Sequence, residues 1–182
     1  KIQKRLFQQI GYQEKDGIDE IGREDNTYIC RWVFQNEKET EEPLFTQDLT
    51  YRNQKLNHVD LSGRNLITIP VPLYRRAGEI VSLNLSRNLS LDVPRDFIQG
   101  CTSLRDIKFN NNEAQALPKS FATASKLTYL DVSNNRLQDL DQCDLSKLEG
   151  LLKLNLANNC LRSLPSTLGA YKSLRTLNIS SN

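Results

Sequence analysis

One pattern of apolar residues recurs along most of this 182-residue chain and restricts its fold more than any other feature. In "LTYLDVSNNRLQDL" (127–140), successive apolar positions are three, two, five and three residues apart. This spacing fits neither one helix nor one strand, so the chain must change conformation within the segment. The same offsets recur in 104–117 and 151–164, and looser copies bring the starting residues to 56, 80, 104, 127, 151 and 174.

The copies start 23 or 24 residues apart, which is the length of a leucine-rich repeat. The alternation at Leu130 and Val132 puts two apolar side chains on one face of a short strand. One such strand cannot bury that face alone, so successive copies must stack as a parallel sheet. We predict an α/β fold, a leucine-rich-repeat solenoid with a curved parallel sheet and an irregular or short-helical convex side. It should cover residues 56–182 in about six repeats, the last one truncated.

Each strand is followed by a sharp turn that leaves backbone N–H and C=O groups without partners in the sheet. An asparagine amide donates and accepts hydrogen bonds at once, so one asparagine per turn can satisfy both kinds of group. The asparagines predicted to form this column are Asn88, Asn112, Asn135, Asn159 and Asn182. In the first copy, Arg64 stands at the same position.

Prolines predict where the convex segments begin, because proline tolerates a site at which no strand N–H is needed. The prolines that follow the last apolar position of a copy are Pro70, Pro94, Pro118 and Pro165. The apolar residues expected to anchor the convex segments to the core are Leu73, Phe97, Phe121 and Leu168. The copy starting at residue 127 departs from this scheme, with Asp141 in place of proline and Leu145 one position late.

The residues before the repeats belong to a different unit. Apolar residues every fourth position predict an amphipathic helix over residues 1–10, ended by Gly11, and "TYICRWVF" (27–34) alternates as a strand does. One helix and one strand cannot enclose a core, so we expect residues 1–34 to be part of a domain that begins upstream. The polar segment 35–55, with its acidic run, reads as a linker.

Composition excludes several classes of function and predicts a compartment. The net charge of +2, from 24 basic and 22 acidic residues, is too small for a nucleic-acid-binding surface. No apolar run could span a membrane, and residues 1–11 lack the apolar core of a signal peptide. The four scattered cysteines, Cys30, Cys101, Cys143 and Cys160, are expected to be reduced thiols. The glycosylation sequons at Asn84, Asn88 and Asn178 coincide with the repeat template, so we regard them as accidental.

The sequence lacks the residues from which an enzyme site would be built. It has one histidine and no glycine-rich loop, so we expect no catalytic, cofactor-binding or metal site in this chain. His58 occupies an outward strand position, where a solvated side chain is expected. Asp139, Asp141 and Asp144 lack the glycine and closing glutamate of an EF-hand loop and are expected to be solvated too.

The outward faces of the strands remain as the candidate functional surface. Three columns of outward residues are expected, beginning at His58, Asp60 and Ser62 and repeating in each copy. They are polar and mixed in charge, which suits reversible recognition of a charged protein surface. The residues expected to contact a partner are Arg105, Asp106, Lys108, Tyr129, Asp131 and Lys153.

Three segments carry a resemblance to a known family. "GREDNTYICRWVF", "HVDLSGRNLITIPVPLYRRAGEIVSLNLSRNLSLDVPRDFI" and "LDVSNNRL" closely resemble the central region of fungal adenylate cyclases, across essentially the whole chain. In that family a Ras-association domain precedes a leucine-rich-repeat array. A phosphatase-like domain follows, and then a class III cyclase domain that converts ATP to cyclic AMP and pyrophosphate with magnesium.

The resemblance implies that residues 1–34 are the end of a ubiquitin-like Ras-association domain and that residues 56–182 are the first repeats. It also implies a regulatory segment that binds a Ras-type small GTPase or another signalling protein. Such a segment would be cytoplasmic and would meet the membrane only through partners. No catalytic residue and no magnesium ligand of the cyclase domain has a counterpart here.

Two other hypotheses stay open at this point. One is a leucine-rich-repeat scaffold of a Ras pathway, or a repeat-containing phosphatase, outside the cyclase family. The other is a secreted repeat receptor, which a mapped disulfide or an occupied sequon would favour.

Overall fold

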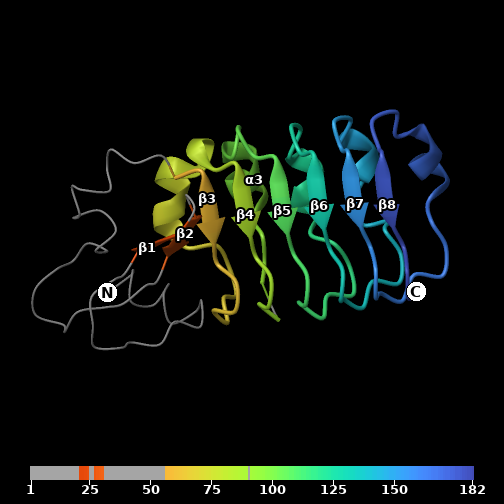
Figure 1. The fold of residues 1–182 in the computed structure, drawn as a ribbon, viewed down its shortest axis with the longest axis horizontal. Coiled ribbons are helices and arrows are strands. Elements are labelled where there is room, and N and C mark those ends of the chain that lie inside the picture. The colour runs from red at the N-terminus through yellow and green to blue at the C-terminus, as the bar shows by residue number, and fades with distance from the viewer. Residues whose placement is uncertain (1–20, 25–26, 31–55, 90) are drawn as a thin grey trace, which may run out of the picture.

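The computed structural model describes residues 21–24, 27–30, 56–89 and 91–182. The helix expected over residues 1–10 and the linker expected over 35–55 lie outside the described residues. In the described part, the chain forms a row of similar coils, each of which contributes one strand to a continuous sheet (Figure 1). The strands, in sheet order, are β1 (Ile21–Glu24), β2 (Thr27–Cys30), β3 (His58–Asp60), β4 (Ser82–Asn84), β5 (Asp106–Lys108), β6 (Tyr129–Asp131), β7 (Lys153–Asn155) and β8 (Thr176–Asn178).

Strands β3 to β8 are parallel and in the predicted register. The central apolar residues that pair across them are Val59, Leu83, Ile107, Leu130, Leu154 and Leu177. All but Leu177 are buried. Four of them lie between two coils, and Val59 lies between the coil of β4 and strand β2. Leu177 lies on β8, at the edge of the described sheet, and is 38% exposed. The solenoid fold is confirmed over the described repeats.

The sheet extends beyond the repeats into the segment that precedes them. β1 and β2 form an antiparallel pair, and β2 runs parallel to β3 with Tyr28 opposite Val59. The expected strand within 27–34 is thus present as Thr27–Cys30, and residues 31–34 lie outside the described part.

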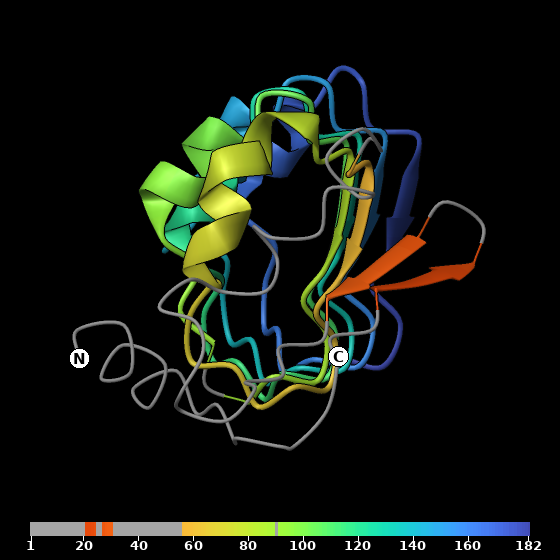
Figure 2. The ribbon, with the colours of Figure 1, turned by 90° about the vertical axis from the view of Figure 1, so that its left-hand side faces the viewer.

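Short helices form the side of the coils opposite the sheet (Figure 2). They are η2 (Val71–Glu79), α3 (Arg95–Gly100), η3 (Lys119–Thr123), η4 (Leu145–Lys147) and η5 (Ser166–Ala170). Four of them begin directly after the predicted prolines. The exception, η4, begins after Asp144, whose carboxylate accepts a hydrogen bond from the Ser146 backbone N–H at 3.2 Å. A side-chain cap therefore starts this helix where the other coils use proline.

The space between sheet and helices is filled by apolar side chains, as the periodicity predicts. The predicted anchors Leu73, Phe97 and Phe121 are fully buried, and Leu145 is buried in the coil that departs from the pattern. The rings of Phe109 and Phe121 meet edge to face with centroids 5.3 Å apart. These contacts tie each strand to the helix behind it.

A left-handed backbone conformation recurs at one position of every turn. The residues there, with φ between +53° and +65°, are Gly63, Arg87, Asn111, Asn134, Asn158 and Ser181. Asparagine and glycine adopt this conformation more readily than other residues. This requirement explains the first residue of each Asn-Asn pair, for which the sequence pattern by itself suggested no role.

Candidate protein-binding face

The asparagines predicted to bridge the turns lie in the interior as a column, here called the buried asparagine column. Its members are Asn88, Asn112, Asn135, Asn159 and, on the exposed last coil, Asn182. Asn135 shows the geometry: its Nδ2 donates to the carbonyl oxygens of Phe109 and Val132, both at 2.9 Å. Its Oδ1 accepts from the backbone N–H groups of Asn112 and Ala114 at 3.0 and 3.1 Å. The amide therefore joins one coil to the next and has no face left for an external ligand.

The same geometry bears on the sequons. The Nδ2 atom of Asn88 donates to the carbonyl oxygens of Leu61, Leu85 and Ser86, and the side chain is fully buried. A glycan is attached through this nitrogen, so Asn88 cannot carry one in the folded chain.

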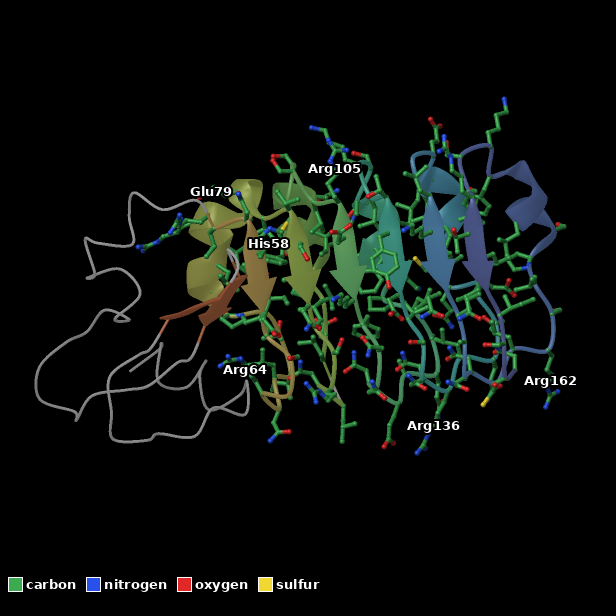
Figure 3. The ribbon with its side chains drawn as sticks, in the orientation of Figure 1. His58, Arg64, Glu79, Arg105, Arg136 and Arg162 are labelled. Carbon is green, nitrogen blue, oxygen red and sulfur yellow. The ribbon has the colours of Figure 1, made fainter. Side chains whose placement is uncertain are left out.

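The six residues expected to contact a partner come together on three adjacent strands and the residue before them. Asp106, Tyr129 and Lys153 form one row across β5, β6 and β7, and Lys108 and Asp131 lie in the next row. Arg105 directly precedes β5 and lies at the rim of the sheet (Figure 3), where its guanidinium donates to the Lys126 carbonyl at 3.2 Å. The outward side of β3 to β8, with the residue before each strand, is called the sheet face from here on.

One part of the predicted sheet face is wrong. The third outward column was expected to be exposed along its length, but Ser86, Ser133 and Ala157 are buried. The chain bends toward the interior directly after each strand, so these side chains lie in the turn and not on the face. The candidate surface is therefore limited to the first two columns and the residues that precede the strands.

The second outward column has a structural role that the sequence reasoning missed. At this position a side-chain oxygen accepts a hydrogen bond from the backbone N–H two residues later, at 2.8 to 3.2 Å. The residues that form this Asx turn are Asp60, Asn84, Asp131, Asn155 and Asn178. In the remaining coil the position is occupied by Lys108. We call these six positions the turn-cap column.

Asp131 is more constrained than an ordinary surface carboxylate. Its Oδ1 accepts from the backbone N–H and the hydroxyl of Ser133 at 3.0 and 2.6 Å. Its Oδ2 accepts from the Tyr129 hydroxyl at 3.2 Å. Burial and the neighbouring carboxylates of Asp131 and Asp106 raise the pKa of the Tyr129 hydroxyl, which therefore remains a neutral donor.

Asp106 is the other carboxylate of this surface and is half-buried. Burial raises the pKa of its carboxyl above the ordinary value, and the charges of His58 and Lys108 act in the opposite direction. Its row across the sheet passes from His58 through Ser82 to Asp106. Neither carboxylate of the expected contact set is thus freely presented to solvent.

The cations of the same surface are presented to solvent. Along β5 to β8, the exposed charged side chains of the sheet face are Arg105, Lys108, Lys153 and Arg175. The four cations outnumber the carboxylates of Asp106 and Asp131, so this half of the sheet face is electropositive although the whole chain is nearly neutral. It is suited to carboxylate groups on a partner protein.

The described residues form no candidate metal site. None of their His, Cys, Asp and Glu side chains form a group of three or more that could hold a metal ion. Asp139 and Asp144 are exposed and accept hydrogen bonds within their own turns, from the backbone N–H groups of Asp141 and Ser146. Cys101, Cys143 and Cys160 are free thiols, and burial raises the pKa of Cys101 to about 12 and of Cys143 to about 11. Within the same residues, no helix has the length and apolar character needed to span a bilayer.

Comparison with sequence families gives a match in each of two parts of the chain. The profile described as "PHLPP protein RA domain" matches residues 1–34. The profile of the leucine-rich repeat matches residues 79–137 and 125–182.

Two fungal proteins are close relatives. An adenylate cyclase of Neurospora crassa is 87% identical over 131 residues, which are 72% of this chain and 6% of that protein. An adenylate cyclase of Podospora anserina is 61% identical over 175 residues, which are 96% of this chain and 8% of that protein. The chain thus spans less than a tenth of the length of these relatives.

Among solved structures, a leucine-rich-repeat protein of Leptospira interrogans superposes with a TM-score of 0.63 and 27% identity. The superposition covers 72% of this chain and 33% of the other. This likeness supports the solenoid fold and carries no information on the partner.

Proposed function

The chain belongs to the leucine-rich-repeat family, and from this we propose that it is a regulatory, protein-binding segment of a fungal adenylate cyclase. The complete enzyme would convert ATP to cyclic AMP and pyrophosphate at a magnesium-dependent site outside this chain. The segment itself would perform no chemistry and would work in the cytoplasm, with reduced thiols, meeting the membrane through its partners.

The finer part of the proposal is that the segment couples a Ras-type GTPase to the production of cyclic AMP. The observation that carries it is the order of two matches, a Ras-association profile over residues 1–34 and repeats from residue 79 onward. The electropositive sheet face of β5 to β8 supplies a second surface for contact with a GTPase or another signalling protein. Arg105, Lys108 and Lys153 are the cations proposed to make this contact, beside Asp106, Tyr129 and Asp131.

The direct test is binding of the whole chain to a Ras-type GTPase, measured by calorimetry with the GTPase loaded with a non-hydrolysable GTP analogue or with GDP. We expect binding that prefers the GTP form. Equal affinity for both forms, or no binding to either, would contradict the proposed coupling.

A charge-reversal variant tests whether the sheet face makes the contact with the GTPase. The double variant Lys108→Glu, Lys153→Glu should bind more weakly and with less dependence on salt, because both exposed cations lie on the sheet face. The matched control is Lys119→Glu, Lys147→Glu, which changes the charge equally on the helical side. Unchanged affinity in the first variant would remove the sheet face from the contact and leave residues 1–34.

The second candidate function is a Ras-pathway scaffold or a repeat-containing phosphatase that is not a cyclase. The observation that favours it is the description of the profile over residues 1–34, which refers to a PHLPP protein. The reading frame downstream of residue 182 separates the candidates: a cyclase domain supports the first, and its absence the second.

A further inference from the structure

The turn-cap column contains one residue that contradicts the local rule of the fold. Asp or Asn closes the turn after β3, β4, β6, β7 and β8 through a side-chain oxygen. After β5 the position belongs to Lys108, whose ammonium group has donors and no acceptor, so it cannot close the turn in this way. A residue that breaks a repeated local rule is expected where function, and not stability, determines the choice.

What the chain gains at this position is an exposed cation near the middle of the sheet face. Lys108 is exposed, and the coils on either side carry the turn caps Asn84 and Asp131 instead. Its charge lies close enough to Asp106 to oppose the effect of burial on the pKa of that carboxyl. Arg105 precedes the same strand, and Lys153 lies two strands away on β7.

The spacing of these cations fits an extended acidic segment. Lys108 pairs in register with Asp131 and Asn155, so Lys153 lies two strands across from it and two residues back along the strand direction. With strands about 4.8 Å apart and a rise of about 3.3 Å per residue, the two positions are about 12 Å apart on the diagonal. An extended peptide covers this distance in about three to four residues. Carboxylates at this spacing on a segment lying diagonally across the strands could therefore meet Lys108 and Lys153 together.

We propose that Lys108 is the anchor of a carboxylate-bearing protein segment that lies across β5 to β7, with Arg105 and Lys153 as its flanking contacts. The proposal rests on the proposed function, since it names the chemistry that the sheet face recognises. A uniformly anionic polymer fits less well than a peptide, because the carboxylates of Asp106 and Asp131 lie between the cations and repel a continuous row of negative charge. The half-buried Tyr129 hydroxyl already donates to Asp131 and is not a free donor to a ligand.

The test uses the whole chain and a fluorescein-labelled peptide with glutamate at every third position and serine between. The control peptide has glutamine in place of glutamate. Lys108→Asn and Lys108→Ala should each weaken binding of the glutamate peptide roughly tenfold at about 0.1 M salt, and the wild-type affinity should fall steeply toward about 1 M. Lys119→Asn, on the opposite side in η3, removes the same charge and should leave the affinity unchanged.

A thermal melt separates loss of the anchor from loss of structure. Lys108→Asn restores the side-chain acceptor of the other coils and should raise the melting temperature by roughly 1–4 °C while it weakens binding. Lys108→Ala should weaken binding without that rise. Unchanged peptide affinity in Lys108→Asn, equal binding of the glutamine peptide, or no rise in melting temperature would overturn the proposal.

Two further sets of binding measurements show which class of anionic partner the sheet face prefers, and separate a failure of the anchor from a failure of the proposed function. Tighter binding of an oligothymidylate strand or of phosphatidylserine vesicles than of the glutamate peptide would overturn the choice of a protein partner. If the wild type and Lys108→Asn bind the GTP-loaded GTPase with equal affinity, the proposed function stands and the anchor role of Lys108 is refuted. If the wild type does not bind the GTPase but binds the glutamate peptide more tightly than Lys108→Asn does, the anchor role of Lys108 stands and the proposed GTPase coupling is refuted.

Discussion

The buried asparagine column and the turn-cap column both stabilise the turn after each strand, yet they accept different residues. The buried column holds asparagine at Asn88, Asn112, Asn135 and Asn159, in each of the coils that are covered on both sides. The turn-cap column holds aspartate or asparagine, and once lysine. Both positions repeat with the same period, so the difference arises from what each side chain must do.

The difference shows that the number and kind of hydrogen bonds, and not the presence of an amide, determine which residues are tolerated. A buried column member must donate to carbonyl oxygens of two coils and also accept from backbone N–H groups, and water cannot replace either bond. A turn cap needs only an acceptor, and its turn is reached by solvent, so aspartate serves equally well and even lysine is tolerated. The chain can therefore vary the turn-cap column for binding, and cannot vary the buried column in the coils that are covered on both sides.

The largest expected effect comes from exchanging asparagine for aspartate in the buried column. Asn135→Asp keeps the acceptor but cannot donate to Phe109 and Val132, and it places a carboxyl group in the interior. We expect a loss of about 3 kcal/mol in the free energy of unfolding at neutral pH, measured by urea denaturation.

The matched control for this exchange is Asn155→Asp in the turn-cap column. It should change the free energy of unfolding by less than about 0.5 kcal/mol, because Asp131 performs the same task naturally. Similar losses in both variants would show that the two columns do not differ in the way described.

An intermediate loss of stability is expected when lysine is introduced at the turn-cap position of a second coil. Asn155→Lys removes the bond that the side chain accepts from the Ala157 N–H at 3.2 Å. The free energy of unfolding should fall by about 1 kcal/mol, measured by the same urea titration. A stability equal to wild type would mean that these caps contribute nothing and that Lys108 breaks no rule.

The smallest effect concerns Asp106, whose carboxyl pKa is raised by burial in the folded chain. A raised pKa means that the protonated form favours folding, so the wild-type chain loses this stability as the pH rises through the range of the carboxyl group. Asp106→Asn cannot ionise and should be more stable at neutral pH by less than about 1 kcal/mol, since solvent screens a half-buried group.

The pH dependence is the diagnostic part of this prediction. The advantage of Asp106→Asn should vanish below about pH 4, where the wild-type carboxyl is protonated as well. Thermal melts at several pH values measure it. An advantage that persists at low pH would show that ionisation is not its cause.

Much of the fold could be predicted because the repeat copies align with one another. The pairing of Leu83, Ile107, Leu130, Leu154 and Leu177 follows from the period alone, since each copy must place the same residue on the same rung. The helices after the prolines follow for the same reason. The sequence pattern did not lead us to predict the left-handed backbone conformation of the residue before each buried asparagine, although the repeated Asn-Asn pair was a visible signal for it.

The candidate face could be predicted only in part. The six expected contact residues do gather on β5 to β7 and the residue before them, but the burial of Ser86 and Ser133 depends on how tightly the turn bends. The internal bonds of Asp131 were missed too. The exceptional nature of Lys108 was present in the sequence, in the series Asp, Asn, Lys, Asp, Asn, Asn at one repeat position. Its meaning required the hydrogen bonds of the other five.

The sequence by itself determined the stacking of coils, the order of the strands and the residues that face the core. An apolar pattern with a constant period leaves only one register in which every strand hides its apolar side. The tertiary structure alone decided which polar groups remain for a partner. That choice depends on bonds between neighbouring turns, which withdraw Asp131 from the surface and leave Lys108 upon it.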